Sequence, residues 1–390
     1  MITEKEFARR RKQLMRMMGK GSIAIIPTSA ECIRNRDVEF PFRADSDFYY
    51  LTGFREPDAV AVLAPGRKHG EYLLFCRERE PAMETWTGRR AGTRGAVETF
   101  GADDAFPISD IGDILPGLLE SCERVYYTIG ALPDFDKRVL DWVGRIRQGA
   151  RAGGRTPDEF ISLEHLLHDM RLYKSRSEIR VMRTAARIAC RGHRRAMQVC
   201  RPEMSEYEIE AELLHEFRRA GMVPAYPCIV GGGENGCILH YTENKDSMRD
   251  GDLLLIDAGA EYDCYASDVT RTFPVNGRFS PAQKALYEVV LAAQAAAIKQ
   301  VRAGKHWNEP HVAAVRVLTR GLVKLGILKG KPAELIKKEA YRRFYMHRTG
   351  HWLGMDVHDV GDYKVGGEWR ELEPGMVLTV EPGIYIAPGS

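Results

Sequence analysis

The sequence predicts two domains, an α/β domain over residues 1–173 and an α+β domain over residues 174–390. Three observations support this division. A chain of 390 residues is longer than one ordinary compact core. Its first part alternates β-rich and helical stretches, and from Ser175 onward long helices with clear start signals separate turn-rich, strand-like segments. In the second domain we therefore expect helices that cover one face of a largely antiparallel sheet.

In the first domain, four segments rich in Ile, Val, Leu and Tyr are predicted strands, namely residues 22–28, 59–64, 71–76 and 124–129. Helices are predicted near residues 108–122 and 134–147. Another helix is expected at the N-terminus, where Phe7, Leu14 and Met18 have helical spacing. The basic run at residues 9–12 belongs to this helix, and we expect it to form a solvated face.

Three helices of the second domain begin with a capping box, in which a serine and an acid or amide three residues later cap each other's backbone. The helix after the second box is expected to end at Gly221, and the helix after the third box at Gly304. The boxes are Ser175-x-x-Glu178, Ser205-x-x-Glu208 and Ser280-x-x-Gln283.

The composition is typical of a globular protein and excludes several classes. The chain has 57 basic and 54 acidic residues, a net charge of +3, which is too balanced for an electrostatic nucleic-acid binder. It has no run of 18 apolar residues and no apolar core of a secretion signal, so no membrane segment is expected. Its eight cysteines form no CxxC pair, which favours reduced thiols and a cytoplasmic location.

The stretch from Leu253 to Thr272 predicts a hairpin that brings two acids together. Four consecutive aliphatic residues indicate a strand buried on both faces, which ends at Asp257. A reversal centred between Tyr262 and Asp263 places Asp268 directly opposite, with β-carbons roughly 5 Å apart. Like charges this close destabilise a sheet unless a cation lies between them. A metal is therefore favoured over the alternative of two surface acids.

Three further clusters carry candidate chemistry. His240 follows a glycine turn, and His347, His351 and His358 lie within twelve positions of one another. The segment 377–383 is predicted as another apolar strand that ends in an acid, Glu381. A lone histidine is more often structural, but this density favours a site. The zinc-protease helix HExxH is absent, because Glu does not follow His347.

Two Asp, one Glu and one His form an oxygen-rich donor set with a single imidazole. Such a set suits Mn²⁺ or another hard divalent ion better than a structural zinc site, which would use sulfur ligands. Bridging carboxylates permit two metals about 3.5–4 Å apart, and a hydroxide between them is the expected nucleophile for hydrolysis. Histidines that do not bind metal are then expected to stabilise the oxyanion or to move a proton to the leaving group.

These clusters, in this order, resemble the Xaa-Pro aminopeptidases (aminopeptidase P) of the pita-bread metallopeptidase family. The N-terminal stretch RADSDFYYLTGFREPDAVAVLAPG (43–66) is similar to the N-terminal domain of that family, and MRLYKSRSEIRVMRTAA (170–186) to its link into the catalytic domain. The similarity covers nearly the whole chain. The catalytic stretches that match are ILHYTEN (238–244), LLLIDAGAEYDCYASDVTRTFPVNGRFS (253–280), HWLGMDVHDVG (351–361) and LEPGMVLTVEPGIYI (372–386).

The resemblance implies a pita-bread catalytic domain that releases the N-terminal residue from peptides with proline at the second position. It also implies a pair of Mn²⁺ ions and a homo-oligomer. Carried over by position, the metal ligands are Asp257, Asp268, His351 and Glu381, and Glu381 also takes part in catalysis. The histidines that bind substrate and stabilise the tetrahedral intermediate are His240, His347 and His358.

The sequence departs from this pattern in three places. The family's fifth ligand is a second, bridging Glu in a strand after the VEPG motif, whereas this sequence stops at Ser390, without that strand. Arg348 replaces a small residue, and Cys264 stands where the family's hairpin usually has Gly. We expect cleavage of Arg-Pro-Pro by a chain extended past Ser390, and little or none by these 390 residues.

Two other functions remain open at this stage. A prolidase-type Xaa-Pro dipeptidase uses the same scaffold, and an inactive pita-bread protein that binds a peptide or a partner would tolerate a missing ligand. A creatinase-like hydrolase is disfavoured, because the Asp, Asp, His and Glu set is retained. A metal content near two Mn²⁺ per chain, measured by elemental analysis, would indicate the enzyme. A chain without Mn²⁺ would indicate the inactive protein.

Overall fold

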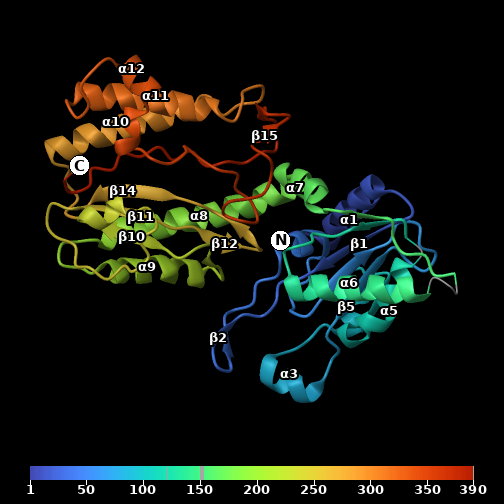
Figure 1. Cartoon of the computed structure of the whole chain (residues 1–390). Helices are drawn as coiled ribbons and strands as arrows, with labels where there is room; N and C mark the ends of the chain where they lie inside the picture. Colours follow the sequence, from blue (N-terminus) through green and yellow to red (C-terminus); the bar gives the residue numbers. More distant parts are fainter. Residues whose placement is uncertain (121, 150–152, 390) are drawn as a thin grey trace. The chain divides into compact units, whose positions relative to one another are not determined.

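The computed structural model of the chain describes residues 1–120, 122–149 and 153–389 (Figure 1). The chain forms two compact units, Ile2–Met170 and Arg171–Ser390, and the division lies within helix α7 (Glu164–Leu172). Within the described ranges, no helix is both long enough and apolar enough to cross a membrane.

The N-terminal unit is built on a mixed six-stranded sheet. Neighbouring strands are antiparallel between β5 and β4 and between β4 and β1, and parallel elsewhere. The predicted strands at residues 22–28, 59–64, 71–76 and 124–129 are confirmed, although the last is three residues shorter than expected. In spatial order the strands are β6 (Asp104–Pro107), β5 (Tyr72–Cys76), β4 (Val60–Leu63), β1 (Ser22–Pro27), β7 (Arg124–Tyr126) and β8 (Glu159–Ile161).

Two of the predicted helices, α5 (Ile111–Leu119) and α6 (Pro133–Gln148), pack on one face of this sheet. Their apolar side chains share a core with alternate residues of the strands, among them Ile23, Val62 and Phe75. The remaining elements of this unit are α1 (Glu4–Met18), α2 (Ser46–Thr52), α3 (Pro81–Thr87), α4 (Gly92–Glu98), η1 (Ile108–Asp110) and the hairpin of β2 (Ile33–Asn35) with β3 (Val38–Glu39).

The basic run of α1 is not a solvated face, so that prediction is wrong for its two central residues. Arg10 is 0% and Arg11 4% exposed. Their guanidinium groups donate to the carbonyl oxygens of Tyr50, at 3.0 Å, and Leu51, at 2.9 Å. These carbonyls belong to the last turn of α2, where unpaired C=O groups and the helix dipole favour a cation. Arg11 also pairs with Glu4 at 2.8 Å.

In the C-terminal unit the three predicted capping boxes are confirmed and begin α8 (Arg176–Val199), α9 (Glu206–Arg219) and α10 (Pro281–Ile298). Helix α9 is followed by its C-cap residue Ala220 and then by Gly221. Gly221 has φ of 72°, the left-handed conformation that commonly ends a helix. Helix α10 ends at Ile298, earlier than the predicted end at Gly304, and the chain around residues 304–307 pairs with residues 370–372. The other helices are α11 (Glu309–Lys324), α12 (Pro332–Lys337), η3 (Gly233–Cys237) and η4 (Ala340–Arg343).

Two small antiparallel sheets lie beside α8 and α9 (Figure 1). One has the order β10 (Ile229–Gly232), β11 (Leu253–Asp257), β14 (Thr270–Pro274), and the other β13 (Tyr265–Ala266), β12 (Ala260–Tyr262), β9 (Val223–Pro224). A further hairpin joins β15 (Lys364–Val365) to β16 (Glu368–Trp369). The prediction of an antiparallel sheet with helices on one face is therefore confirmed.

The aliphatic run of strand β11 predicts burial on both faces, but only one face is fully buried. Leu254 and Ile256 are fully buried and share a core with apolar residues of α8 and α9. Leu253, Leu255 and Asp257 alternate with them and are only partly buried. Because side chains along a strand alternate between faces, Asp257 points away from the core shared with the helices.

Candidate metal centre

The hairpin that carries Asp257 and Asp268 differs in register from the prediction by two residues. Asp257 pairs with Thr270, not with Asp268, and Tyr262 pairs with Tyr265. The turn therefore consists of Asp263 and Cys264, which have φ of 55° and 62°. Two successive residues with positive φ are what a tight two-residue hairpin turn needs, and this preference outweighs the polar signal one residue earlier. Direct opposition of the two acids is therefore wrong.

The two acids nevertheless remain on the same face, because a shift by two residues preserves the alternation of a strand. Asp268 is the diagonal neighbour of Asp257, and Tyr226 connects them. The Tyr226 hydroxyl lies 2.5 Å from Asp257 Oδ1 and 3.1 Å from Asp268 Oδ1. Burial raises the pKa of Asp257 to about 7, and the nearby charges of Asp268 and Glu381 act in the same direction. Two carboxylates thus lie close together at a site where burial already makes it difficult for one of them to lose its proton.

Sequence reasoning missed Tyr226. It lies in a short loop between Pro224 and Pro227, and no local pattern there indicates a polar role. Burial, followed by the charges of Asp257 and Asp268, raises its pKa, so its hydroxyl remains a proton donor to both acids. Only the approach of this loop to the hairpin reveals the contact.

His351 and Glu381 come together because the segments around them run antiparallel. The backbone N–H groups of Thr379 and Glu381 donate to the carbonyls of His351, at 3.0 Å, and Thr349, at 2.8 Å. A single bridge joins Trp352 to Leu378, so the segment 377–383 is extended but is not the regular strand that its apolar pattern predicts. Apart from the buried Pro382, its residues are partly buried, and they have too few ladder partners for a strand.

His351 presents one ring nitrogen to the acids. Its Nδ1 lies 2.8 Å from the Trp352 carbonyl oxygen, and its Nε2 lies 3.2 Å from Asp268 Oδ2 and 3.3 Å from Glu381 Oε1. Burial lowers the pKa of His351, but the hydrogen bonds to Asp268 and Glu381 outweigh burial and raise it to about 10. A carbonyl on Nδ1 is the arrangement that orients a metal-binding histidine with Nε2 toward the ion.

The other predicted histidines lie at different places around this centre. The ring of His358 is 4.3 Å from that of His351, in an edge-to-face arrangement. Burial, then the positive charge of His351, lowers the pKa of His358. His347 Nε2 lies 2.9 Å from the hydroxyl of Tyr385, a second residue that sequence reasoning missed. His240 is exposed, and its charge also lowers the pKa of His358.

The loop that carries His240 is held by a buried acid that sequence reasoning missed. Glu206, the first residue of α9, is 0% exposed. Its carboxylate accepts hydrogen bonds from Gly232 N at 2.7 Å, Asn235 Nδ2 at 3.0 Å, Tyr241 Oη at 2.7 Å and Asp246 N at 3.0 Å. The start of α9 thus connects the glycine turn to the segment that follows His240.

The donor set fits a divalent cation, although the described residues do not form a preformed coordination site. Among residues 1–120, 122–149 and 153–389, no three His, Cys, Asp or Glu side chains surround a common metal position. Instead, His351 directly contacts Asp268 and Glu381, and Tyr226 contacts the two aspartates. Protons thus link the groups that an ion would link. Adjacent acids, one with a raised pKa, and an oriented imidazole are the chemistry that a hard divalent ion satisfies.

Comparison with protein families assigns both parts of the chain. Residues 180–390 match the model of metallopeptidase family M24, and residues 7–126 match that of the aminopeptidase P N-terminal domain. A Xaa-Pro aminopeptidase of Escherichia coli is 49% identical over 389 residues, which are 99% of this chain and 88% of the relative. Human Xaa-Pro aminopeptidase 3 is 32% identical and aligns over 99% of this chain and 77% of its own.

Solved structures agree with these matches. The structure of Pseudomonas aeruginosa aminopeptidase PepP has a TM-score of 0.99 and 63% identity, and the match covers 100% of this chain and 88% of that one. A zinc-substituted aminopeptidase P of Escherichia coli in complex with product has a TM-score of 0.97 and 48% identity, over 100% of this chain and 88% of that one. The likeness therefore extends over both units.

Proposed function

The chain belongs to metallopeptidase family M24 and is a Xaa-Pro aminopeptidase, and we propose that Asp257, Asp268, His351 and Glu381 hold its metal ions. The observation that supports this assignment is the contact of His351 Nε2 with Asp268 at 3.2 Å and Glu381 at 3.3 Å. Three of the four donors are carboxylates, which favours two Mn²⁺ ions over a softer metal, with other hard divalent ions as substitutes. When bound, such ions activate water and polarise the scissile carbonyl.

The chain's own groups hold the substrate and carry protons. His358 stands against His351 with a lowered pKa, so at neutral pH its uncharged ring can hydrogen-bond a substrate carbonyl. His347, beside Tyr385, and the exposed His240 flank the same centre and are assigned to substrate binding. Breaking the bond before proline leaves an amine that needs a proton. We assign this transfer to the Glu381 carboxylate, which would take a proton from the attacking water and pass it to the proline nitrogen; it accepts a hydrogen bond from Thr379 Oγ1 at 2.7 Å.

Metal titration tests the ligand set. In Asp268→Asn, we expect the Mn²⁺ dissociation constant to rise on the order of 100-fold, because one charged oxygen donor is lost. Asp263→Asn is the matched control: it makes the same charge change in the turn of the same hairpin, where Asn accepts positive φ. Calorimetric titration of the three proteins measures the difference. Equal affinity in all three would exclude Asp268 as a ligand.

Peptide hydrolysis separates the aminopeptidase from a dipeptidase. Arg-Pro-Pro and Ala-Pro are assayed with and without Mn²⁺. We expect Mn²⁺-dependent cleavage of the tripeptide. Cleavage restricted to Ala-Pro would indicate a prolidase-type preference.

Two further assignments concern the assembly and the location of the protein. A homo-oligomer is implied by the resemblance alone, and sedimentation velocity of the purified protein measures it. A cytoplasmic location is supported by the eight cysteines, which form no CxxC pair and show no regular spacing. Secretion of the protein from its own cell would contradict that location.

A further inference from the structure

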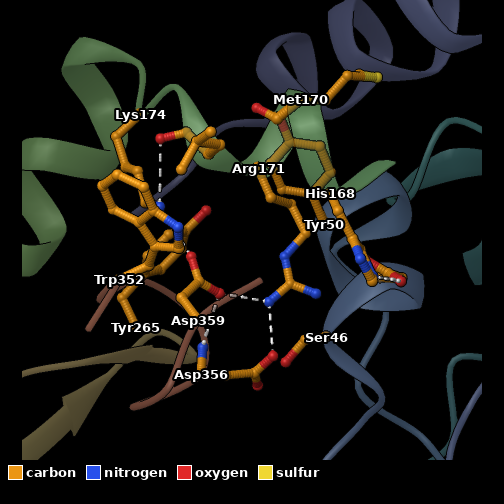
Figure 2. A network of polar contacts seen from close by, with 12 residues as sticks. Ser46, Tyr50, His168, Met170, Arg171, Lys174, Tyr265, Trp352, Asp356 and Asp359 are labelled. Carbon is orange, nitrogen blue, oxygen red and sulfur yellow. Dashed lines mark hydrogen bonds and ion pairs between the residues drawn. The ribbon is translucent and has the colours of Figure 1, made fainter. Parts of the chain in front are cut away.

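A buried cluster of charges lies next to the segment that carries His351 and His358 (Figure 2). Asp359, with a side chain 1% exposed, accepts from Arg171 Nη2 at 2.7 Å and from Lys174 Nζ at 2.8 Å. Arg171 also pairs with Asp356 at 2.6 Å. Two cations thus face two carboxylates, and each Asp359 oxygen has its own cation. Charges are buried in this way only when they are paired, so removing one partner leaves the other strongly destabilised.

Asp359 is connected to His351 through one backbone carbonyl. The Trp352 oxygen accepts from Asp359 N at 2.9 Å and from His351 Nδ1 at 2.8 Å. The carbonyl of Gly354 accepts from Ala266 N at 2.8 Å, which attaches the same segment to the strand just before Asp268. The Asp359 carboxylate therefore lies at the closing end of the short loop whose start presents the imidazole.

The loop packs closely against the Asp359 carboxylate at Gly354. A β-carbon at Gly354 would lie 2.0 Å from Asp359 Oδ2 and 2.9 Å from Lys174 Cε, so only glycine fits against the ion pair. Lys174 is also bound through its backbone, because its N–H donates to Gly375 O at 2.9 Å. The cluster thus has little room to adopt another arrangement.

From these contacts we infer that Asp359, held by Lys174 and Arg171, is a positioning residue for His351 and His358. It fixes the Trp352 carbonyl, which orients the His351 ring, and it anchors the chain directly after His358. The inference rests on the proposed metal role of His351. A role in folding alone would lower stability without changing how the folded protein binds metal.

The test uses the double variant Lys174→Met with Asp359→Asn, which removes one cation and one carboxylate and leaves Arg171 paired with Asp356. We expect the Mn²⁺ dissociation constant to rise about 10- to 100-fold, as for other groups that support a metal ligand. In the metal-free protein, hydrogen exchange at the amides of Ala266 and residue 359 should become faster. The matched control is Arg191→Met with Glu216→Gln, which removes an ion pair of 2.7 Å between α8 and α9. This control should change neither the Mn²⁺ dissociation constant nor hydrogen exchange at Ala266 and residue 359.

Each outcome decides the inference. A folded double variant that binds Mn²⁺ within about twofold of the unchanged chain would overturn it, whatever its stability. Should the double variant fail to fold, Lys174→Met alone takes its place, since Asp359 then keeps Arg171, and the same criterion applies. If the unchanged chain binds no Mn²⁺, the proposed metal centre fails by itself. Hydrogen exchange of the metal-free double variant then tests the positioning role, and an unchanged exchange rate at the amides of Ala266 and residue 359 would refute it.

Discussion

At the scale of single residues, the hairpin of Asp257 and Asp268 depends on a glycine. A β-carbon at Gly259 would lie 1.7 Å from the carbonyl oxygen of Ser267, the residue before Asp268. This close approach is what brings the second acid next to the first. Cys264 shows the opposite case, because it adopts φ of 62° in the turn although glycine would do so at lower cost. The cysteine that stands where the family's hairpin usually has Gly therefore adopts the conformation that the turn needs.

Gly259→Ala should destabilise the C-terminal unit by about 3 kcal/mol, because backbone must move to admit the methyl group. It should also weaken Mn²⁺ binding, since Asp268 moves with Ser267. Gly144→Ala, in helix α6 with nothing within 4 Å of the added carbon, is the control. It should stabilise by roughly 0.5–1 kcal/mol through helix propensity. Urea unfolding measures both changes, and a neutral Gly259→Ala would contradict the predicted clash.

His311 makes stability depend on pH without binding metal. Its Nδ1 lies 2.9 Å from Thr349 Oγ1, and the Thr349 backbone carbonyl accepts from Glu381. Burial, followed by the positive charges of Arg348 and His347, lowers the pKa of His311 to about 4. The unfolded chain therefore binds this proton more readily than the folded one. The contribution of His311 is fully present above the unfolded value near 6.5 and is lost as pH falls toward 4.

We expect His311→Gln to reduce the loss of stability between pH 7 and pH 4.5 by about 1.5 kcal/mol, because solvent partly screens the charge of the partly exposed ring. Other groups titrate in the same range, so the measured quantity is the difference between variant and unchanged protein in urea unfolding at the two pH values. Parallel pH profiles would show that His311 is protonated equally easily in both states.

At the scale of elements, the start of α9 holds two loops in place. The Glu206 carboxylate has four neutral donors from the glycine turn and the segment after His240, and it lies at the positive end of the α9 dipole. The capping box at Ser205 predicts the helix start but not this second role. The partners come from residues 232–246, which only the fold brings to the helix.

Glu206→Ala should lower the free energy of unfolding by about 3 kcal/mol or more, since it leaves several buried donors unpaired. Glu212→Ala, on the same helix, removes an ion pair with Arg195 in which both side chains are partly exposed, and should cost at most about 1 kcal/mol. Urea unfolding compares the two. Similar small losses would mean that water replaces Glu206 as the acceptor.

At the scale of the whole molecule, the proposed metal ligands all lie in the unit Arg171–Ser390. Two of them come from one hairpin, and the other two from antiparallel segments about thirty residues apart in the chain. The N-terminal unit contributes no proposed ligand. Metal binding is therefore expected to stabilise one unit selectively.

At 100 times its dissociation constant, Mn²⁺ should stabilise the unit that binds it by about 2.7 kcal/mol. Hydrogen exchange with and without Mn²⁺ measures this by residue: amides of β11, β14 and the loop after His351 should exchange more slowly, and those of the N-terminal sheet should not change. Slower exchange confined to the N-terminal sheet would place the ion elsewhere.

Local sequence determined the elements and the chemical types at the site. The capping boxes at Ser175, Ser205 and Ser280 predict helix starts correctly, because the cap satisfies N–H groups within the same four residues. Period-two alternation keeps Asp257 and Asp268 on one face even though the observed register differs from the predicted one by two residues. The order of motifs was enough to indicate the family.

The tertiary structure alone decided which groups these residues meet. Tyr226 joins the two aspartates, Glu206 gathers the His240 loop, and Asp359 supports the His351 loop, all through partners distant in sequence. Arg10 and Arg11 are buried for the same reason, because their acceptors are carbonyls at the end of another helix. Local patterns report propensity and periodicity, whereas burial and pairing depend on contacts that form only when distant segments pack together.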